Sequence, residues 1–76
     1  MKNNNAPSYN EFRKATLEAL KGYKRFGKFY KVEDIEEDIK FEYKSATQSL
    51  ESGRITVEQF LNYEPKSAAH EIDMCY

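Results

Sequence analysis

A single stripe of apolar positions organises the segment from Val32 to Leu50. Successive residues of an α-helix advance by about 100°, and at that spacing one set of apolar side chains falls within a sector of roughly 80°: Val32, Ile35, Ile39, Tyr43, Ala46 and Leu50. Asp34, Glu37, Asp38 and Gln48 point away from this stripe. The pattern predicts a helix from Val32 to Ser52 that buries this stripe against the rest of the chain.

A second apolar stripe precedes it and follows a helix start signal. Ser8 and Glu11 form an S-x-x-E capping box, in which each side chain satisfies a backbone amide of the first turn. The pattern predicts a helix from Tyr9 to Phe26, ended by Gly27, with Lys24 and Arg25 in its last turn. Its inward stripe consists of Phe12, Ala15, Thr16, Ala19, Tyr23 and Phe26. Leu20 lies at the edge of this stripe, and Leu17 lies toward the opposite side of the helix.

The connection at 28–31 is short, which predicts that the two helices lie antiparallel as a hairpin. Phe29 and Tyr30 are then expected to cover the open end of the core. Tyr30 also lies in phase with the first stripe, so a continuous helix through Gly27 is the alternative. In that case the two stripes pack between chains rather than within one.

The remaining sequence predicts short helices. Thr56 and Gln59 form a second capping box, which opens a helix from Val57 to Tyr63 that Pro65 stops. Its inward side chains are expected to be Val57, Phe60 and Leu61. A weak terminal helix from Ser67 to Met74 carries Ala68, Ala69, Ile72 and Met74. The fold class is therefore all-α, a small helical bundle built on an antiparallel hairpin plus one or two short C-terminal helices.

Length and composition favour one domain. We predict a flexible tail at 1–7 and a single helical domain at 8–76, because 76 residues support one small core. The net charge is −1, and Cys75 is the only cysteine, so no disulfide can form within the chain. The N-terminal residues lack the apolar run of a signal peptide, and no stretch is apolar enough to span a membrane. We expect a cytoplasmic protein.

Catalytic and metal-binding chemistry is poorly supported. Ser67, His70 and Glu71 supply a hydroxyl, an imidazole and a carboxylate, but a terminal segment does not position a triad, and His70 is expected at the surface. The stretch after Gly53 resembles the second half of an EF-hand, yet Gln48 and Gln59 stand where calcium needs carboxylates. We therefore expect no enzyme activity, no metal and no cofactor.

Acidic residues and one aromatic side chain mark the outer face of the central helix. Phe41 projects about 180° from the buried stripe. Such a residue among acids is a candidate anchor for a partner pocket, unless the C-terminal segment folds over it. The candidate partner-binding residues are Glu33, Asp34, Glu37, Asp38 and Phe41.

The first helix instead carries a basic face, which is the alternative candidate. Cations along one helical face can bind phosphates, although they also serve solubility, and the near-zero net charge argues against nucleic acid. The candidate nucleic-acid-binding residues are Lys14, Lys21, Lys24, Arg25 and Lys28.

These features favour a non-enzymatic protein-interaction module. We expect a small inhibitor or regulator, of the kind that phages and other mobile elements encode, which occupies a surface on a larger protein. Its acidic face suits a basic groove that otherwise holds nucleic acid. The alternatives are a small nucleic-acid-binding protein, which is the second choice, and a homodimer or other structural subunit.

Overall fold

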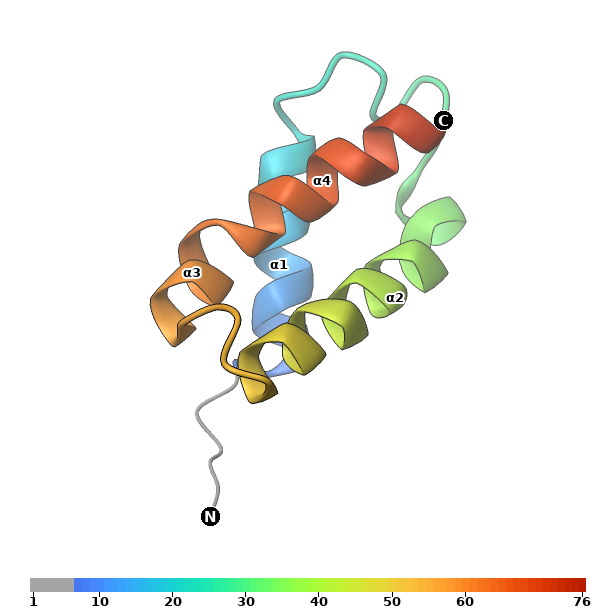
Figure 1. Cartoon of the computed structure of the whole chain (residues 1–76). Helices are drawn as coiled ribbons and strands as arrows, with labels where there is room; N and C mark the ends of the chain where they lie inside the picture. Colours follow the sequence, from blue (N-terminus) through green and yellow to red (C-terminus); the bar gives the residue numbers. More distant parts are fainter. Residues whose placement is uncertain (1–6) are drawn as a thin grey trace.

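The computed structural model describes residues 7–76 as four helices connected by loops (Figure 1). These are α1 (Tyr9–Leu20), α2 (Val32–Glu51), α3 (Val57–Asn62) and α4 (Glu64–Cys75). The predicted all-α bundle is confirmed. α1 and α2 run in opposite directions within one chain and pack against each other, so the alternative of one continuous helix is wrong. None of the described helices is long and apolar enough to cross a membrane.

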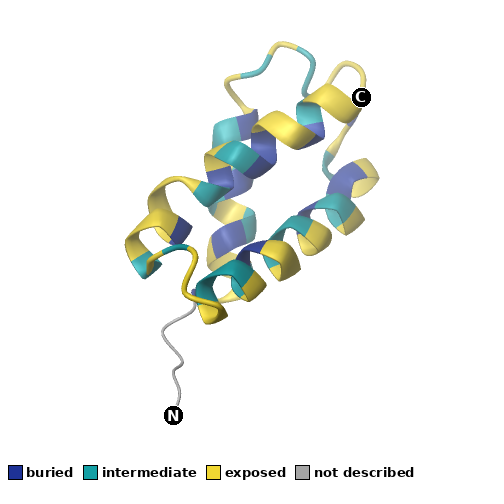
Figure 2. Ribbon diagram, in the orientation of Figure 1, coloured by how far each residue is buried: buried dark blue, intermediate teal, exposed yellow. Residues whose placement is uncertain are grey.

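The core lies where all four helices meet, and its buried positions face inward along each helix (Figure 2). The buried stripe predicted for α2 is confirmed for Ile35, Ile39 and Ala46, which are buried, and for Tyr43 and Leu50, which pack against the core. Val32 is the exception, because it is only half-buried and lies outside the core. The other buried apolar side chains come from α1, the loop before α2, α3 and α4. They are Phe12, Leu20, Tyr30, Phe60, Ala68, Ala69 and Ile72.

α1 ends at Leu20, so the predicted end at Phe26 is wrong. Lys21 is the C-cap, and the next amides turn back by only three residues: Gly22 N–H donates to the carbonyl of Ala19 at 3.2 Å. Glycine disfavours helix continuation at this position. The assignments within α1 also change, because Leu20 is fully buried rather than flanking, and Leu17 is half-buried against the core rather than turned away from it.

The loop at 21–31 closes on itself. Gly27 has a φ of +89°, and its N–H donates to the carbonyl of Tyr30 at 2.8 Å. Tyr30 is buried and its hydroxyl donates to the carboxylate of Asp73, which ties the loop to α4. Phe29 remains 71% exposed, so only one of the two aromatic residues covers the core as expected.

The C-terminal helix is longer than the sequence predicted. α4 begins at Glu64, and Pro65 lies in its first turn, where a missing amide costs nothing. Pro65 therefore does not act as a stop before a loop. α4 makes the most extensive contact with α1, and Ala68 and Ala69 allow this close approach because their side chains are small. The inward placement predicted for Leu61 is wrong, since Leu61 is exposed, and Met74 on α4 is exposed as well.

Both predicted capping boxes are present. The amides and side chains of Ser8 and Glu11 exchange hydrogen bonds at the start of α1, and those of Thr56 and Gln59 do so at the start of α3. The predicted tail at 1–7 lies outside the described residues except for Pro7. Pro7 is buried, and its carbonyl accepts a hydrogen bond from the Tyr43 hydroxyl at 2.8 Å.

Candidate functional site

Phe41 lies on the outer face of α2 and is 69% exposed. No described segment folds over Phe41. The alternative that the C-terminal segment covers this side chain is therefore wrong. Glu37 lies one turn before Phe41 and Glu33 lies one turn before Glu37, because residues four apart share a helical face. Both acids are exposed, and together with Phe41 they form an unbroken row on this face.

The two aspartates of the acidic face already have partners within the chain. The carboxylate of Asp34 accepts the Lys31 amide at 2.9 Å and so caps α2. The hydroxyl of Tyr76 lies within hydrogen-bonding distance of the Asp34 carbonyl, at 3.0 Å, and of the Asp38 carboxylate. The hydrogen bond to Asp38 raises the pKa of Tyr76 to about 12. This contact fastens the C-terminus to α2, and we missed it because the partners are far apart in sequence.

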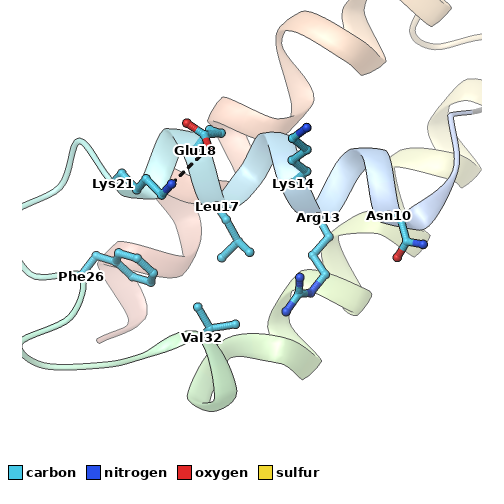
Figure 3. Close-up of a pocket in the computed structure, with 8 residues that line it drawn as sticks. All are labelled: Asn10, Arg13, Lys14, Leu17, Glu18, Lys21, Phe26 and Val32. Atoms are coloured by element: carbon cyan, nitrogen blue, oxygen red, sulfur yellow. Dashed lines mark hydrogen bonds and ion pairs between the residues drawn. The ribbon is translucent and has the colours of Figure 1, made fainter.

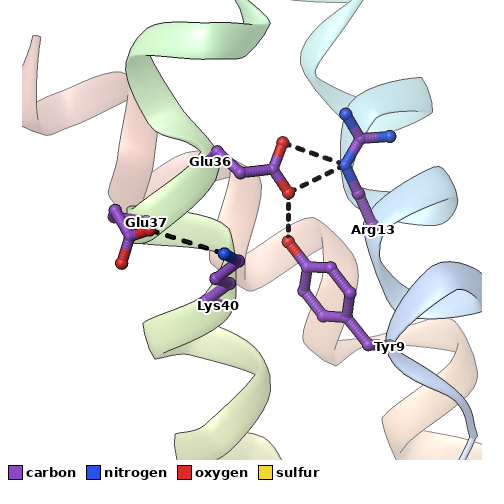
Figure 4. A network of polar contacts seen from close by, with 5 residues as sticks. All are labelled: Tyr9, Arg13, Glu36, Glu37 and Lys40. Atoms are coloured by element: carbon purple, nitrogen blue, oxygen red, sulfur yellow. Dashed lines mark hydrogen bonds and ion pairs between the residues drawn. The ribbon is translucent and has the colours of Figure 1, made fainter.

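A further acid, Glu36, joins α2 to α1 (Figure 4). Its carboxylate accepts hydrogen bonds from Arg13 Nε, at 3.0 and 3.1 Å, and from the Tyr9 hydroxyl. These hydrogen bonds lower the pKa of Glu36. Burial and the same carboxylate raise the pKa of Tyr9 to about 12. This network joins α1 to α2 and holds the Arg13 side chain against α2. The next residue, Glu37, pairs with Lys40 at 3.5 Å.

The candidate phosphate-binding cations divide between α1 and the loop that follows it. Lys14 is exposed on α1, and Lys21 lies at its C-cap in an ion pair with Glu18 at 3.2 Å. Lys24, Arg25 and Lys28 belong to the loop at 21–31, so the predicted single helical face is wrong.

One of the loop cations, Arg25, lies against Phe29, an exposed aromatic residue that was expected to cover the core. The guanidinium carbon of Arg25 lies 5.3 Å from the centroid of the Phe29 ring, which is a cation–π arrangement. Every charged side chain from Lys21 to Lys31 is a cation. The loop therefore presents positive charge and one open aromatic side chain together.

Glu42 faces the acids of α4 and has an unfavourable environment. Burial, and then the charges of Glu71 and Glu64, raise its pKa. A carboxyl group whose pKa is raised by folding binds its proton more tightly in the folded state. Its ionisation therefore costs stability once the pH exceeds the ordinary value of 4.5.

We expect Glu42→Gln to raise the free energy of unfolding at pH 7, because the amide is neutral at every pH. The gain should shrink as the pH falls and vanish below about 4, where both side chains are uncharged. Urea unfolding at several pH values measures this difference. Glu58→Gln, an exposed position on α3, is the matched control. An equal gain at pH 3 and pH 7 would contradict the electrostatic cause.

Within residues 7–76, His, Cys, Asp and Glu side chains form no group of three that could hold a metal ion. His70 is exposed on α4, where the sequence placed it, and Cys75 is exposed and free. Comparison with known proteins gives no relative from which a site could be transferred: no family model, no curated protein and no solved structure matches this chain.

Proposed function

We propose that this protein is a non-enzymatic protein-interaction module, a small inhibitor or regulator that binds a surface of a larger protein through the outer face of α2. The exposure of Phe41 carries this proposal. α2 buries Ile35 and Ile39 in the core and leaves an aromatic ring uncovered on the opposite side. Aromatic side chains of this kind, once buried in a partner pocket, supply much of the binding energy of an interface.

The charge around Phe41 favours a basic partner surface. Glu33 and Glu37 are exposed and lie in the same row as Phe41. Complementary charges speed association and select partners more than they hold a complex together. The chemistry therefore suits a groove lined by lysine or arginine, including one that otherwise binds nucleic acid. Asp34 and Asp38 have smaller roles here, because their oxygens already serve the cap of α2 and the Tyr76 hydroxyl.

Phe41→Ala should accelerate dissociation of the complex by about 30-fold, since a buried aromatic anchor contributes on the order of 2 kcal/mol. Surface plasmon resonance with a captured partner measures the rate. Tyr63→Ala is the matched control, because Tyr63 is 62% exposed but lies between α3 and α4. Glu33→Gln with Glu37→Gln should instead slow association, and more so at low salt.

The fold must survive for this test to hold. Phe41→Ala is expected to leave the melting temperature nearly unchanged, because the side chain makes little buried contact. A large loss of stability would mean that Phe41 belongs to the core. Unchanged stability together with unchanged dissociation would place the interface elsewhere.

Single-stranded nucleic acid is the second candidate ligand, and the loop at 21–31 favours it. Cationic side chains with an exposed aromatic ring are the elements that bind phosphates and stack on bases. Arg25 lies over the ring of Phe29, Lys24 and Lys28 belong to the same loop, and Lys14 and Lys21 lie on α1 and at its C-cap.

A fluorescent oligonucleotide tests this candidate. Binding should weaken steeply between low and physiological salt, and Lys24→Glu with Lys28→Glu should abolish it. Phe29→Ala should weaken binding by about tenfold through lost stacking. Arg54→Glu, a charge change at an exposed position between α2 and α3, is the control. Absence of binding at low salt would eliminate this candidate.

A further inference from the structure

A groove of about 400 Å³ lies between α1, the loop residue Phe26 and the first residue of α2 (Figure 3). It is separate from the row of Glu33, Glu37 and Phe41, whose residues do not line it. Its lining is composed of Asn10, Arg13, Lys14, Leu17, Glu18, Lys21, Phe26 and Val32.

The groove combines an apolar floor with a cationic rim. The side chains of Leu17, Phe26 and Val32 converge from three segments of the chain (Figure 3), and each is only half-buried. Covering such an exposed apolar floor with another apolar side chain removes both surfaces from water and therefore lowers the free energy. The floor is therefore suited to receiving a hydrophobic side chain.

The rim carries a net positive charge. Three cations line the groove against one carboxylate, that of Glu18. Arg13 is held by Glu36, whereas Lys14 is exposed and takes part in none of the ion pairs found in residues 7–76. The pair of Lys21 and Glu18 is more than 60% exposed on both sides, and such a pair contributes too little to resist exchange for another carboxylate.

The groove is long rather than compact. The six lining positions along α1 and its C-cap, from Asn10 to Lys21, are separated alternately by three residues and by one, which places them on one face. At 1.5 Å per residue this face extends for about 16 Å, or three helical turns. A length of that order matches a chain segment lying along the helix better than it matches a small compact ligand.

We propose that this groove binds an acidic amphipathic segment of a partner protein. The segment places an apolar side chain on the floor formed by Leu17, Phe26 and Val32, and its carboxylates lie against Lys14 and Lys21. The protein then has two docking surfaces of opposite charge, one on α2 and one beside α1. Binding in this groove does not depend on Phe41. An experiment can therefore refute the proposal for one surface without refuting the proposal for the other.

The probe for this site is a fluorescein-labelled acidic peptide of about twelve residues, the length that spans the groove as a helix. Leu and Phe occupy one helical face and Glu the other. We expect binding to shift the backbone amide resonances of Lys14, Leu17 and Val32 in the ¹⁵N-labelled protein. A peptide of the same composition, scrambled so that no apolar face forms, should bind at least about tenfold more weakly.

Paired variants separate this groove from other surfaces. Leu17→Gln and Lys14→Glu should each weaken peptide binding by about tenfold. Leu61→Gln on α3 and Lys44→Glu on α2 make the same chemical changes at exposed positions that do not line the groove, and they should leave binding unchanged. Circular dichroism establishes that each variant is folded. The Lys14→Glu surface substitution keeps the test valid if Leu17→Gln unfolds the protein.

Four outcomes would overturn the proposal. The scrambled peptide could bind equally well, which means that charge alone acts. The shifts could map to the loop around Lys28 instead of the groove. An oligonucleotide could shift the groove resonances and displace the peptide, which makes the site a nucleic-acid site. Sedimentation could show self-association that Leu17→Gln abolishes, which means that a second copy of this chain occupies the groove.

Discussion

Ile39→Asp is expected to unfold the protein. Ile39 is fully buried at the middle of α2 and belongs to the cluster of apolar side chains that forms the core. Burying an unpaired carboxylate costs several kcal/mol, and the cavity left by the smaller side chain adds to that cost. A domain of this size has a free energy of unfolding of only about 5 kcal/mol. Far-ultraviolet circular dichroism should therefore lose most of its helical signal.

Phe41→Asp provides the matched control, because it lies two residues away on the same helix and introduces the same carboxylate. Phe41 is 69% exposed, so the new charge stays in water and the helical signal should persist. If Ile39→Asp retained the spectrum and melting temperature of the wild type, the assigned phase of α2 would be wrong.

Tyr30→Ala should lower the free energy of unfolding by about 3–5 kcal/mol, the usual cost of removing a buried aromatic ring. Tyr30 is 2% exposed, and its ring centroid lies 5.6 Å from that of Phe26 and 5.0 Å from that of Tyr76. It therefore joins the loop at 21–31 to the end of α4. Urea unfolding measures the loss.

Tyr30→Phe separates the ring from its hydroxyl. This variant keeps the packing and removes only the hydrogen bond to Asp73, so it should cost about 1–2 kcal/mol. Burial and the Asp73 carboxylate also raise the pKa of Tyr30, which indicates that the phenol is held in its neutral form. Equal losses for the two substitutions would show that the ring does not pack as described.

Local signals explain why α2 and the capping boxes could be predicted. The helix from Val32 to Leu50 can be predicted without knowing what packs against it, because apolar residues recur at the helical spacing over its whole length. The capping boxes of Ser8 and Thr56 likewise use contacts within three residues. The exposure of Phe41 follows from the same helical phase.

The apolar stripe of α1 continues beyond the helix, and for that reason the predicted end lay at Phe26 rather than at Leu20. Tyr23 and Phe26 do pack against the core, as their phase indicated, but from a loop closed by the turn at Gly27. Apolar periodicity indicates which residues face the core but not whether their backbone is helical. Here Tyr23 and Phe26 reach the core from a loop. Gly22 was the available signal for the break.

Tertiary contacts determine the remaining features. The packing of α4 against α1 relies on Ala68 and Ala69. Alanine gives only a weak hydrophobic signal in a sequence, so its burial in this contact could not be predicted. The links between Arg13 and Glu36 and between Tyr76 and Asp38 join residues that the sequence keeps far apart. Of the acidic candidates on α2, Glu33 and Glu37 stay exposed in the row of Phe41, although Glu37 also pairs with Lys40. The two aspartates are held by hydrogen bonds within the chain.

Affinity capture with three immobilised forms of the protein tests the role of α2 most directly. Wild type, Phe41→Ala and Tyr63→Ala are exposed to a nuclease-treated extract of cells that produce the protein, and retained proteins are quantified by mass spectrometry. We expect one protein to be retained by wild type and Tyr63→Ala and lost from Phe41→Ala, with all three forms equally folded. Equal retention by all three forms would contradict a binding surface centred on Phe41.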